Sequence, residues 1–438
     1  MKTAYDFMVN SNKTALTGSL ACLFVTAVLG CISPVAQAQL NWHSCGNSSD
    51  GSSREHFSGG YLDSSGKVVV PAIFSQVEKF YDGVAVVKQV RDEHERPQAH
   101  VLIDRTGKVL SERFVGYRIH DRSPDIALEF ENGWYICSRK GSPKYGPYKR
   151  CDALIGNKAF VFQSGCLSIF ENGQVLKRLK GIRYVIPCRY SDLLLARARS
   201  CTGVINAKGD WVVPPIFDEI GDFSEGLAVA KFPPSRAAGK NACNSRACYI
   251  AQDGRIVFPK RFSNADAFVT GFAAIAVVTE KNEERWGIIN NAGDVVLEPS
   301  YKYIAVWKNG IALLFLDDRT EQLYDCRTKS FGIKANRITA LGNQMYAVQL
   351  KSNPGSFHLQ RSWKELSTIQ PEVVVNGFCG GFDENTVGPS LVPFFTEVGT
   401  VKRFGWLDRS GQARIPPNFS YAREFSEGLA GFYIPDDK

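Results

Sequence analysis

The chain has 438 residues, of which 44% are hydrophobic, 12% aromatic and 22% charged. This composition excludes a largely disordered chain, because enough apolar surface is present to offset the entropy lost on ordering. The formal net charge is +8, but Lys and Arg are interleaved with Asp and Glu along the chain. That scatter argues against a phosphate-binding stripe and against nucleic acid as a partner.

Residues 1–38 have the three-part form of a secretory signal. A positively charged start precedes an apolar run from Ala15 to Val28, and small residues lead to a cleavage site after Ala38. The run is too short to span a bilayer core of roughly 30 Å, so no transmembrane span is expected after cleavage. The residues around Cys31 also resemble a lipoprotein box, in which Cys31 would be lipidated. We therefore predict a periplasmic or secreted protein, with an envelope lipoprotein as the alternative.

After a polar segment at residues 39–59, the sequence repeats one pattern. In four of the five clear copies an Asp or Asn stands three residues before a glycine, and in all five a second glycine follows 17 residues after the first. The clear units are residues 60–88, 203–231, 248–278, 287–315 and 405–434, with degenerate units at 100–137, 166–196 and 322–350 and an irregular stretch at 357–400. Residues 60–438 therefore form a repeat array.

The spacing within a unit predicts three short strands. Asp or Asn followed three residues later by glycine forms a type I turn closed by a left-handed residue, which joins two strands as a hairpin. The proline that follows cannot donate to a sheet and is expected to end the second strand. The second glycine opens a third strand. The turn glycines are Gly66, Gly209, Gly254, Gly293 and Gly411.

We therefore predict an all-β fold of tandem antiparallel three-stranded meanders. The chain enters the array at a first strand, Gly60 to Asp63, and leaves it after a third strand, Leu429 to Ile434. Pairing these two strands would complete the broken unit and leave no open edge. A propeller-like ring is therefore favoured over an open β-solenoid, which remains the alternative.

The units resemble the bacterial WG repeat. The resemblance lies in Trp286-Gly287, in Phe404-Gly405-Trp406, in Val212 to Phe217, and in the Phe-Ser-Glu-Gly-Leu-Ala stretches that begin at Phe223 and Phe425. Only one copy keeps the literal Trp-Gly order, so tryptophan is not expected to be a binding element. The resemblance implies a β-rich tandem repeat and carries no general activity.

Ten of the twelve cysteines follow Ala38, and an even number in an exported protein favours disulfides over a metal site. Cys137 and Cys151 bracket one loop between units, and Cys243 and Cys248 lie at the end of another. A bridge across the base of a hairpin meets the Cα separation of about 4.4–6.8 Å that a disulfide requires. We predict these two disulfides and leave the other pairings open.

The sequence contains no pattern that predicts a chemical centre. The six histidines form no close pair at metal-ligand spacing, and nucleophile-elbow, Walker and HExxH motifs are absent. Asp63, Glu225, Asp408 and Glu427 are expected to serve the turns of the repeat. We expect no catalytic residue, no metal and no cofactor. The sequence therefore predicts a binding module for a protein or glycan, with an envelope hydrolase or a purely structural component as alternatives.

Overall fold

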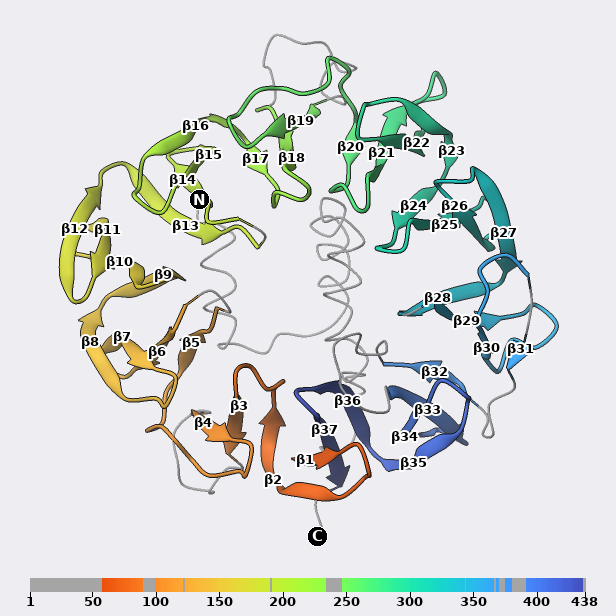
Figure 1. The fold of residues 1–438 in the computed structure, drawn as a ribbon, viewed down its shortest axis with the longest axis horizontal. Helices are drawn as coiled ribbons and strands as arrows, with labels where there is room; N and C mark the ends of the chain where they lie inside the picture. The colour runs from red at the N-terminus through yellow and green to blue at the C-terminus, as the bar shows by residue number, and fades with distance from the viewer. Residues whose placement is uncertain are drawn as a thin grey trace, which may run out of the picture. The chain divides into compact units, whose positions relative to one another are not determined.

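The computed structural model describes residues 57–89, 99–120, 123–189, 191–233, 246–342, 344–365, 368–369, 375–379 and 391–435. Within these residues every regular element is a β-strand, and the strands pair antiparallel into nine sheets. The sheets follow one another around a ring (Figure 1). The predicted all-β ring is therefore confirmed and the open solenoid is wrong. The predicted signal at residues 1–38, with Cys31, lies outside the described residues.

The strands follow one another around the ring in chain order. The sheet that contains the first and last strands has β36 (Tyr421–Ser426), β37 (Leu429–Pro435), β1 (Phe57–Asp63), β2 (Val68–Val77), β3 (Val84–Gln89) and β4 (His100–Asp104). The next three sheets are β5 (Gly116–Arg118), β6 (Asp125–Phe130), β7 (Gly133–Ser138) and β8 (Pro143–Tyr148); β9 (Arg150–Ile155), β10 (Lys158–Gln163), β11 (Cys166–Glu171) and β12 (Gln174–Leu179); and β13 (Ile182–Pro187), β14 (Leu194–Ala198), β15 (Cys201–Ile205) and β16 (Trp211–Phe217).

The second half of the ring has the same arrangement. A three-stranded sheet has β17 (Glu219–Ile220), β18 (Leu227–Lys231) and β19 (Ala247–Ala251). The remaining sheets are β20 (Asn264–Ala265), β21 (Phe272–Val278), β22 (Glu284–Asn290) and β23 (Val295–Tyr301); β24 (Tyr303–Val306), β25 (Ile311–Phe315), β26 (Glu321–Asp325) and β27 (Ser330–Ala335); β28 (Arg337–Gly342), β29 (Met345–Gln349), β30 (His358–Gln360) and β31 (Thr368–Ile369); and β32 (Gly377–Phe378), β33 (Val392–Val398), β34 (Val401–Leu407) and β35 (Ala413–Phe419).

The six-stranded sheet contains two blades joined through β2. The start of β2 pairs with β1, through Val70 and Tyr61, and its end pairs with β3, through Val77 and Val87. In the repeat that starts at Gly203 the corresponding stretch is divided into β16, the last strand of one sheet, and β17, the first strand of the next. The ring therefore has one blade more than it has sheets.

The two ends of the chain close the ring. Strand β37 pairs with all seven residues of β1, from Phe57 with Pro435 to Asp63 with Leu429. The pairing expected between the first and last strands of the array is therefore present. One blade is built from both ends of the chain, so neither terminal strand is left with an open edge there.

Each sequence unit is offset by half a blade from the sheets. Within a blade the first strand lies toward the centre of the ring and the last at its outer edge (Figure 1). The unit at Gly203 supplies the third and outer strands of one blade, β15 and β16, and the inner two strands of the next, β17 and β18. A unit thus has four strands where three were expected. The outer strand also continues through Pro214 and Pro215, because its free edge needs no backbone donor.

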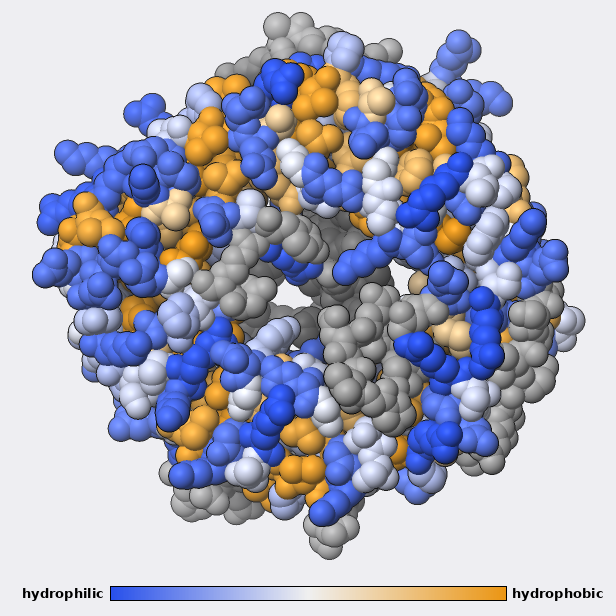
Figure 2. Space-filling model, in the orientation of Figure 1, coloured by the Kyte–Doolittle hydropathy of each residue, from blue (hydrophilic) through white to orange (hydrophobic). Residues whose placement is uncertain are grey.

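Apolar side chains fill the spaces between neighbouring blades. One such cluster joins Val213 and Phe217 of β16 to Phe223 and Ile250 of the next blade, and all four are buried. In Figure 2 hydrophobic residues show mainly within the blades, and hydrophilic residues cover most of the visible surface. The blades are therefore held together by a series of apolar cores around the ring.

The alternation of strand direction gives the ring two different faces. Links between the first and second strands of a blade, and between the third and fourth, lie on what we call the turn face. Links between the second and third strands, and the crossovers from an outer strand to the next inner strand, lie on what we call the connector face.

Candidate interaction face

The predicted hairpin turns are built by side-chain caps. The Oδ1 atom of Asp63 accepts hydrogen bonds from the N–H groups of Ser65 at 2.9 Å and Lys67 at 3.1 Å, and Asp408 does the same for Ser410 and Gln412. The turn glycines have φ values of +85° at Gly66, +76° at Gly209, +84° at Gly254, +88° at Gly293 and +87° at Gly411. These residues shape the turn face and contribute no chemistry.

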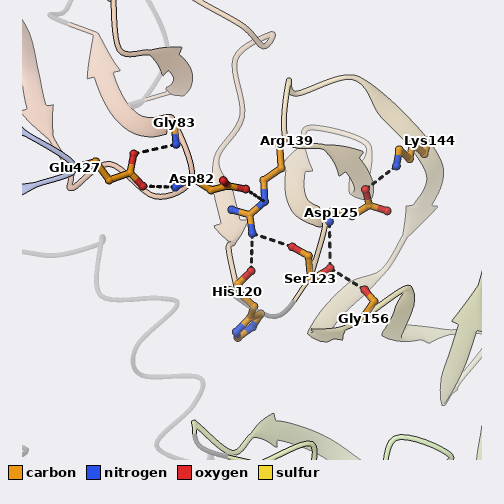
Figure 3. Close-up of polar contacts among 9 residues, drawn as sticks. All are labelled: Asp82, Gly83, His120, Ser123, Asp125, Arg139, Lys144, Gly156 and Glu427. Carbon is orange, nitrogen blue, oxygen red and sulfur yellow. Dashed lines mark hydrogen bonds and ion pairs between the residues drawn. The ribbon is translucent and has the colours of Figure 1, made fainter. Parts of the chain in front are cut away.

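The glutamate of each Phe-Ser-Glu-Gly stretch links two blades. Glu427 accepts hydrogen bonds from the backbone N–H groups of Asp82 and Gly83 in the next blade (Figure 3). Arg105 also donates to it, at 2.7 Å. Glu225 likewise accepts from the N–H of Gly271 at 2.9 Å. Both carboxylates therefore join neighbouring blades, which extends their expected role in the turns.

A second set of contacts continues around the turn face. Arg139 lies against the Asp82 carboxylate at 3.8 Å and donates to the backbone oxygens of His120 and Ser123 (Figure 3). The hydroxyl of Ser123 donates to the backbone oxygen of Gly156, at the start of the following blade, at 3.0 Å. Arg139 is partly buried and its partners are mainly backbone atoms. This network fixes neighbouring blades relative to one another.

The structure does not form the disulfide predicted between Cys137 and Cys151. Both cysteines are free and buried, and they lie in different apolar clusters. The reason is the unpredicted strand β8, which separates β7, with Cys137, from β9, with Cys151. Burial raises the pKa of each thiol to about 12, so both stay protonated. For the other predicted pair, Cys248 is free and buried, and Cys243 lies outside the described residues.

Across the residues that the structure describes, no three side chains from His, Cys, Asp and Glu gather as ligands for a metal ion. Nor does that part of the chain contain a helix with the length and apolar character needed to cross a membrane.

The turn face carries one shallow hollow of about 420 Å³, between the turn at residues 206–208 and the loop at residues 191–193. Asp192 and Lys208 are its only ionisable residues, and Gln252 of the next blade completes it. A single carboxylate does not provide the acid and base pair that glycoside hydrolysis uses. The hollow gives no support to the hydrolase alternative.

The connector face contains a cluster centred on Asp218, in the crossover between β16 and β17. The carboxylate of Asp218 lies 3.9 Å from Arg197 and 3.6 Å from Arg246. Arg197 also donates to the Asp218 backbone oxygen, and Arg246 donates to that of Phe232 at 3.1 Å. One carboxylate thus holds two guanidinium groups that are still partly exposed, leaving an excess of positive charge.

The ring of Phe232 extends this cluster into the next blade. Arg261 lies over the Phe232 ring, with its guanidinium carbon 4.1 Å from the ring centroid. The ring of Phe217 also packs against Phe232, with 4.9 Å between the two ring centroids. A guanidinium over an aromatic face is held in place while its charge remains available to a partner. Arg261 is exposed.

Toward β9, side-chain hydrogen bonds to backbone oxygens connect three more arginines. Arg150 donates to the backbone oxygen of Arg183 at 2.6 Å, and Arg183 donates to that of Arg199 at 3.5 Å. Arg199 lies two residues after Arg197 in the same turn region. We call the whole set, which runs over the connector face from β9 to the approach to β20, the arginine arc: Arg150, Arg183, Arg197, Arg199, Arg246 and Arg261.

Sequence reasoning missed the arc because its members are scattered along more than a hundred residues and mixed with acidic ones. A signal was nevertheless present. Arg150, Arg183 and Arg261 come just before or at the start of an inner strand, and Arg197 and Arg246 flank links between second and third strands. Aligning basic residues by their position within the unit would have placed them on one face.

A closed ring of radially arranged antiparallel sheets, with inner strands at the axis, defines a β-propeller. Its repeats match the family model described as "WG containing repeat" at residues 60–89, 203–232, 286–318 and 404–436. The chain is a WG-repeat protein, in agreement with the resemblance of its units. The copy that starts at Cys248 has the same turn geometry but lies outside the matched ranges.

Solved structures of other proteins are only distantly similar. The computationally designed Ika8 protein has a TM-score of 0.33 and 12% identity, over 66% of this chain and 95% of that one. BamB from Moraxella catarrhalis has a TM-score of 0.31 and 10% identity, over 82% and 96%. The WD40 β-propeller domain of Doa1 has a TM-score of 0.24 and 12% identity, over 56% and 94%. No curated protein matches the sequence.

Proposed function

We propose that the protein is an exported interaction scaffold that binds a partner protein on its connector face and catalyses no reaction. The observation that supports this proposal most directly is the difference between the two faces of the ring. The turns between third and fourth strands repeat one capped geometry around the ring. The links between second and third strands range from Ser164-Gly165 to the stretch between Lys231 and Ala247. Variable loops on a rigid repeat are where recognition is usually located.

The charge of the connector face supports the same proposal. The loops that carry the arc expose cations, whereas Asp82, Arg139 and Glu427 of the turn face are engaged in contacts between blades (Figure 3). A repeat β-propeller provides a large rigid surface with little conformational entropy to lose on binding. Such a surface suits association with another macromolecule better than turnover of a small substrate.

Site-specific photo-crosslinking tests this function. A photoreactive residue would be placed at Ser200 or Lys281 on the connector face, and at Lys67 or Lys208 on the turn face as matched exposed controls. We expect a defined crosslinked protein from the connector positions in cell-envelope extract and none from the turn-face positions. Equal crosslinking from both faces, or none from either, would contradict the proposal.

Export is tested separately by the mass of the protein purified from the producing cell. Cleavage after Ala38 predicts a mature N-terminus at Gln39, whereas lipidation predicts an acylated Cys31. Retention of residues 1–38 would reject export without affecting the assignment of the binding face.

A further inference from the structure

We infer that the arginine arc recognises an acidic segment of the partner protein, an inference that rests on the proposed function. Six guanidinium groups from successive blades follow one another along the connector face through the contacts described above. Because these groups come from rigid strand ends and crossovers, their spacing is set by the ring before any partner binds.

The arc has fewer carboxylates than guanidinium groups. Arg150 pairs with Asp152, and Arg197 and Arg246 share Asp218. Within the described part of the chain, no carboxylate lies at ion-pairing distance from Arg183, Arg199 or Arg261, and all three are exposed. Among the described residues these three positive charges have no carboxylate partner, and because they are exposed an anionic partner can pair with them at a small desolvation cost.

Exposed lysines strengthen the positive potential along the same path. Lys149 lies between β8 and β9, Lys180 lies between β12 and β13, and Lys260 stands next to Arg261 before β20. Each occupies a crossover on the connector face. The positive charge thus extends across consecutive crossovers and forms a band that can steer an acidic partner toward this part of the ring.

The chemistry of the arc fits carboxylates. Arg150 already holds Asp152 with two parallel contacts, from Nε to Oδ1 at 2.5 Å and from Nη2 to Oδ2 at 3.1 Å. This two-pronged geometry is the arrangement in which guanidinium groups bind carboxylates most strongly. The glutamate and aspartate side chains of a partner would offer the same group to Arg183, Arg199 and Arg261.

The neighbouring connectors limit the length of the occupant. In the blade that follows Arg261, exposed Glu280 and Glu283 lie in the link between β21 and β22, and Glu284 is the first residue of β22. Arg285 pairs with Glu283 and with Asp317 of the next blade, so the charges there are matched and offer a long polyanion no further excess of positive charge. A short acidic protein segment covers the arc alone, so the face selects against extended polyanionic chains.

Binding of a poly-glutamate peptide to the full mature protein tests the inference. The arc variant carries Arg199→Glu, Lys260→Glu and Arg261→Glu. The control variant carries Lys67→Glu, Lys108→Glu and Lys208→Glu, with the same charge change on the turn face. We expect the dissociation constant to rise at least about tenfold in the arc variant and less than about twofold in the control. Added salt should weaken binding to the wild-type protein, and matching melting temperatures would show that both variants fold.

Three outcomes would overturn the inference. Equal losses in the two variants would show that only net charge matters. Binding of heparin without binding of poly-glutamate would assign the arc to a sulfated glycan. If the arc variant, with its photoreactive residue at Ser200, still formed the wild-type crosslink, the scaffold function would stand and the acidic partner would be rejected. An absence of connector-face crosslinks in the wild-type protein would instead reject the proposed function itself.

Discussion

The glycine at the position of the Trp-Gly pair is required in four units by a close backbone approach. A Cβ atom added at Gly405 would lie 2.5 Å from the backbone oxygen of Ile415, and one at Gly203 would lie 2.4 Å from that of Val213. The same approach occurs at Gly60 and Gly287. The outer strand bulges toward the third strand at this point, so a side chain there must displace backbone.

Replacing this glycine should therefore destabilise the fold. Gly405→Ala is expected to lower the free energy of unfolding by about 1–3 kcal/mol, because the clash is with backbone that cannot easily move. Chemical denaturation monitored by tryptophan fluorescence would measure it. Gly355→Ala is the matched control, since nothing lies within 4 Å of the added Cβ. A loss as large at residue 355 would contradict the steric explanation.

The inter-blade role of Glu427 makes ring stability depend on pH. Burial raises the pKa of this carboxyl, but hydrogen bonds from Arg105, Gly83 and Asp82 outweigh burial, and the pKa lies below its usual value of 4.5. A carboxyl with a depressed folded pKa adds stability above its unfolded pKa and loses it as the pH falls through the folded pKa.

We therefore expect the melting temperature of the wild-type protein to fall below about pH 4.5 more steeply than that of Glu427→Gln. At neutral pH the variant should melt lower, because the amide offers Arg105 no charge. Calorimetry across this pH range, with Glu280→Gln on the connector face as control, would measure the difference. Parallel pH profiles for wild type and variant would exclude the role assigned to Glu427.

At the scale of elements, the outer strands combine proline with exposed apolar side chains. In β16, Pro214 and Pro215 lie between Trp211 and Ile216, which are 41% and 53% exposed. An outer edge with free N–H groups and apolar side chains is prone to pair with a second molecule. The prolines remove donors from that edge and so protect it.

Removing the prolines should promote self-association. Pro214→Val with Pro215→Val is expected to aggregate faster near the melting temperature, because the outer strand regains backbone N–H donors between Trp211 and Ile216. Light scattering would follow this. Pro259→Val, outside any strand, serves as the control. Unchanged scattering in the double variant would show that the edge is protected by something else.

The elements that sequence reasoning missed share a physical cause. Three features were predictable from backbone chemistry. Asp or Asn followed by glycine marks the turns, proline marks the outer strands, and the second glycine of each unit marks the start of the second strand of a blade. The inner strand was missed: β17 contains only Glu219-Ile220 and is followed by Gly221, so it has neither length nor alternation. The outer strand β8 was also missed, because Ser138 takes the place of Asp or Asn three residues before Gly141 in the preceding turn, and this led to the incorrect Cys137–Cys151 bridge. The arginine arc was missed because it exists only after the ring has aligned equivalent positions.

At the scale of the whole molecule, the pairing of β37 with β1 holds the ring closed. Around it, Lys79 pairs with Glu424 at 2.6 Å and Arg423 with Glu78 at 3.2 Å, and the Tyr433 hydroxyl accepts from the Val77 N–H. Each contact joins residues from opposite ends of the chain. Folding of the last blade thus requires the complete array, which makes unfolding cooperative over a long sequence separation.

Deletion of residues 427–438 should therefore open the ring and expose the edge of β1. We expect lower thermal stability and dimers that grow with concentration, measured by analytical ultracentrifugation. The control is a circular permutant that joins Pro435 to Phe57 through a short linker and begins within residues 234–245. It keeps the β37–β1 pair and should remain monomeric. A monomeric and equally stable deletion variant would refute closure by β37.

The offset between sequence unit and blade affects how rings of this kind can grow. A tandem duplication one unit long adds two outer strands to one blade and two inner strands to the next, wherever its break points fall. Every sheet therefore keeps its full complement of strands and the terminal seam is preserved. Ring size can change by whole blades in a single genetic step, and each added blade brings a new connector on which a charged contact can evolve.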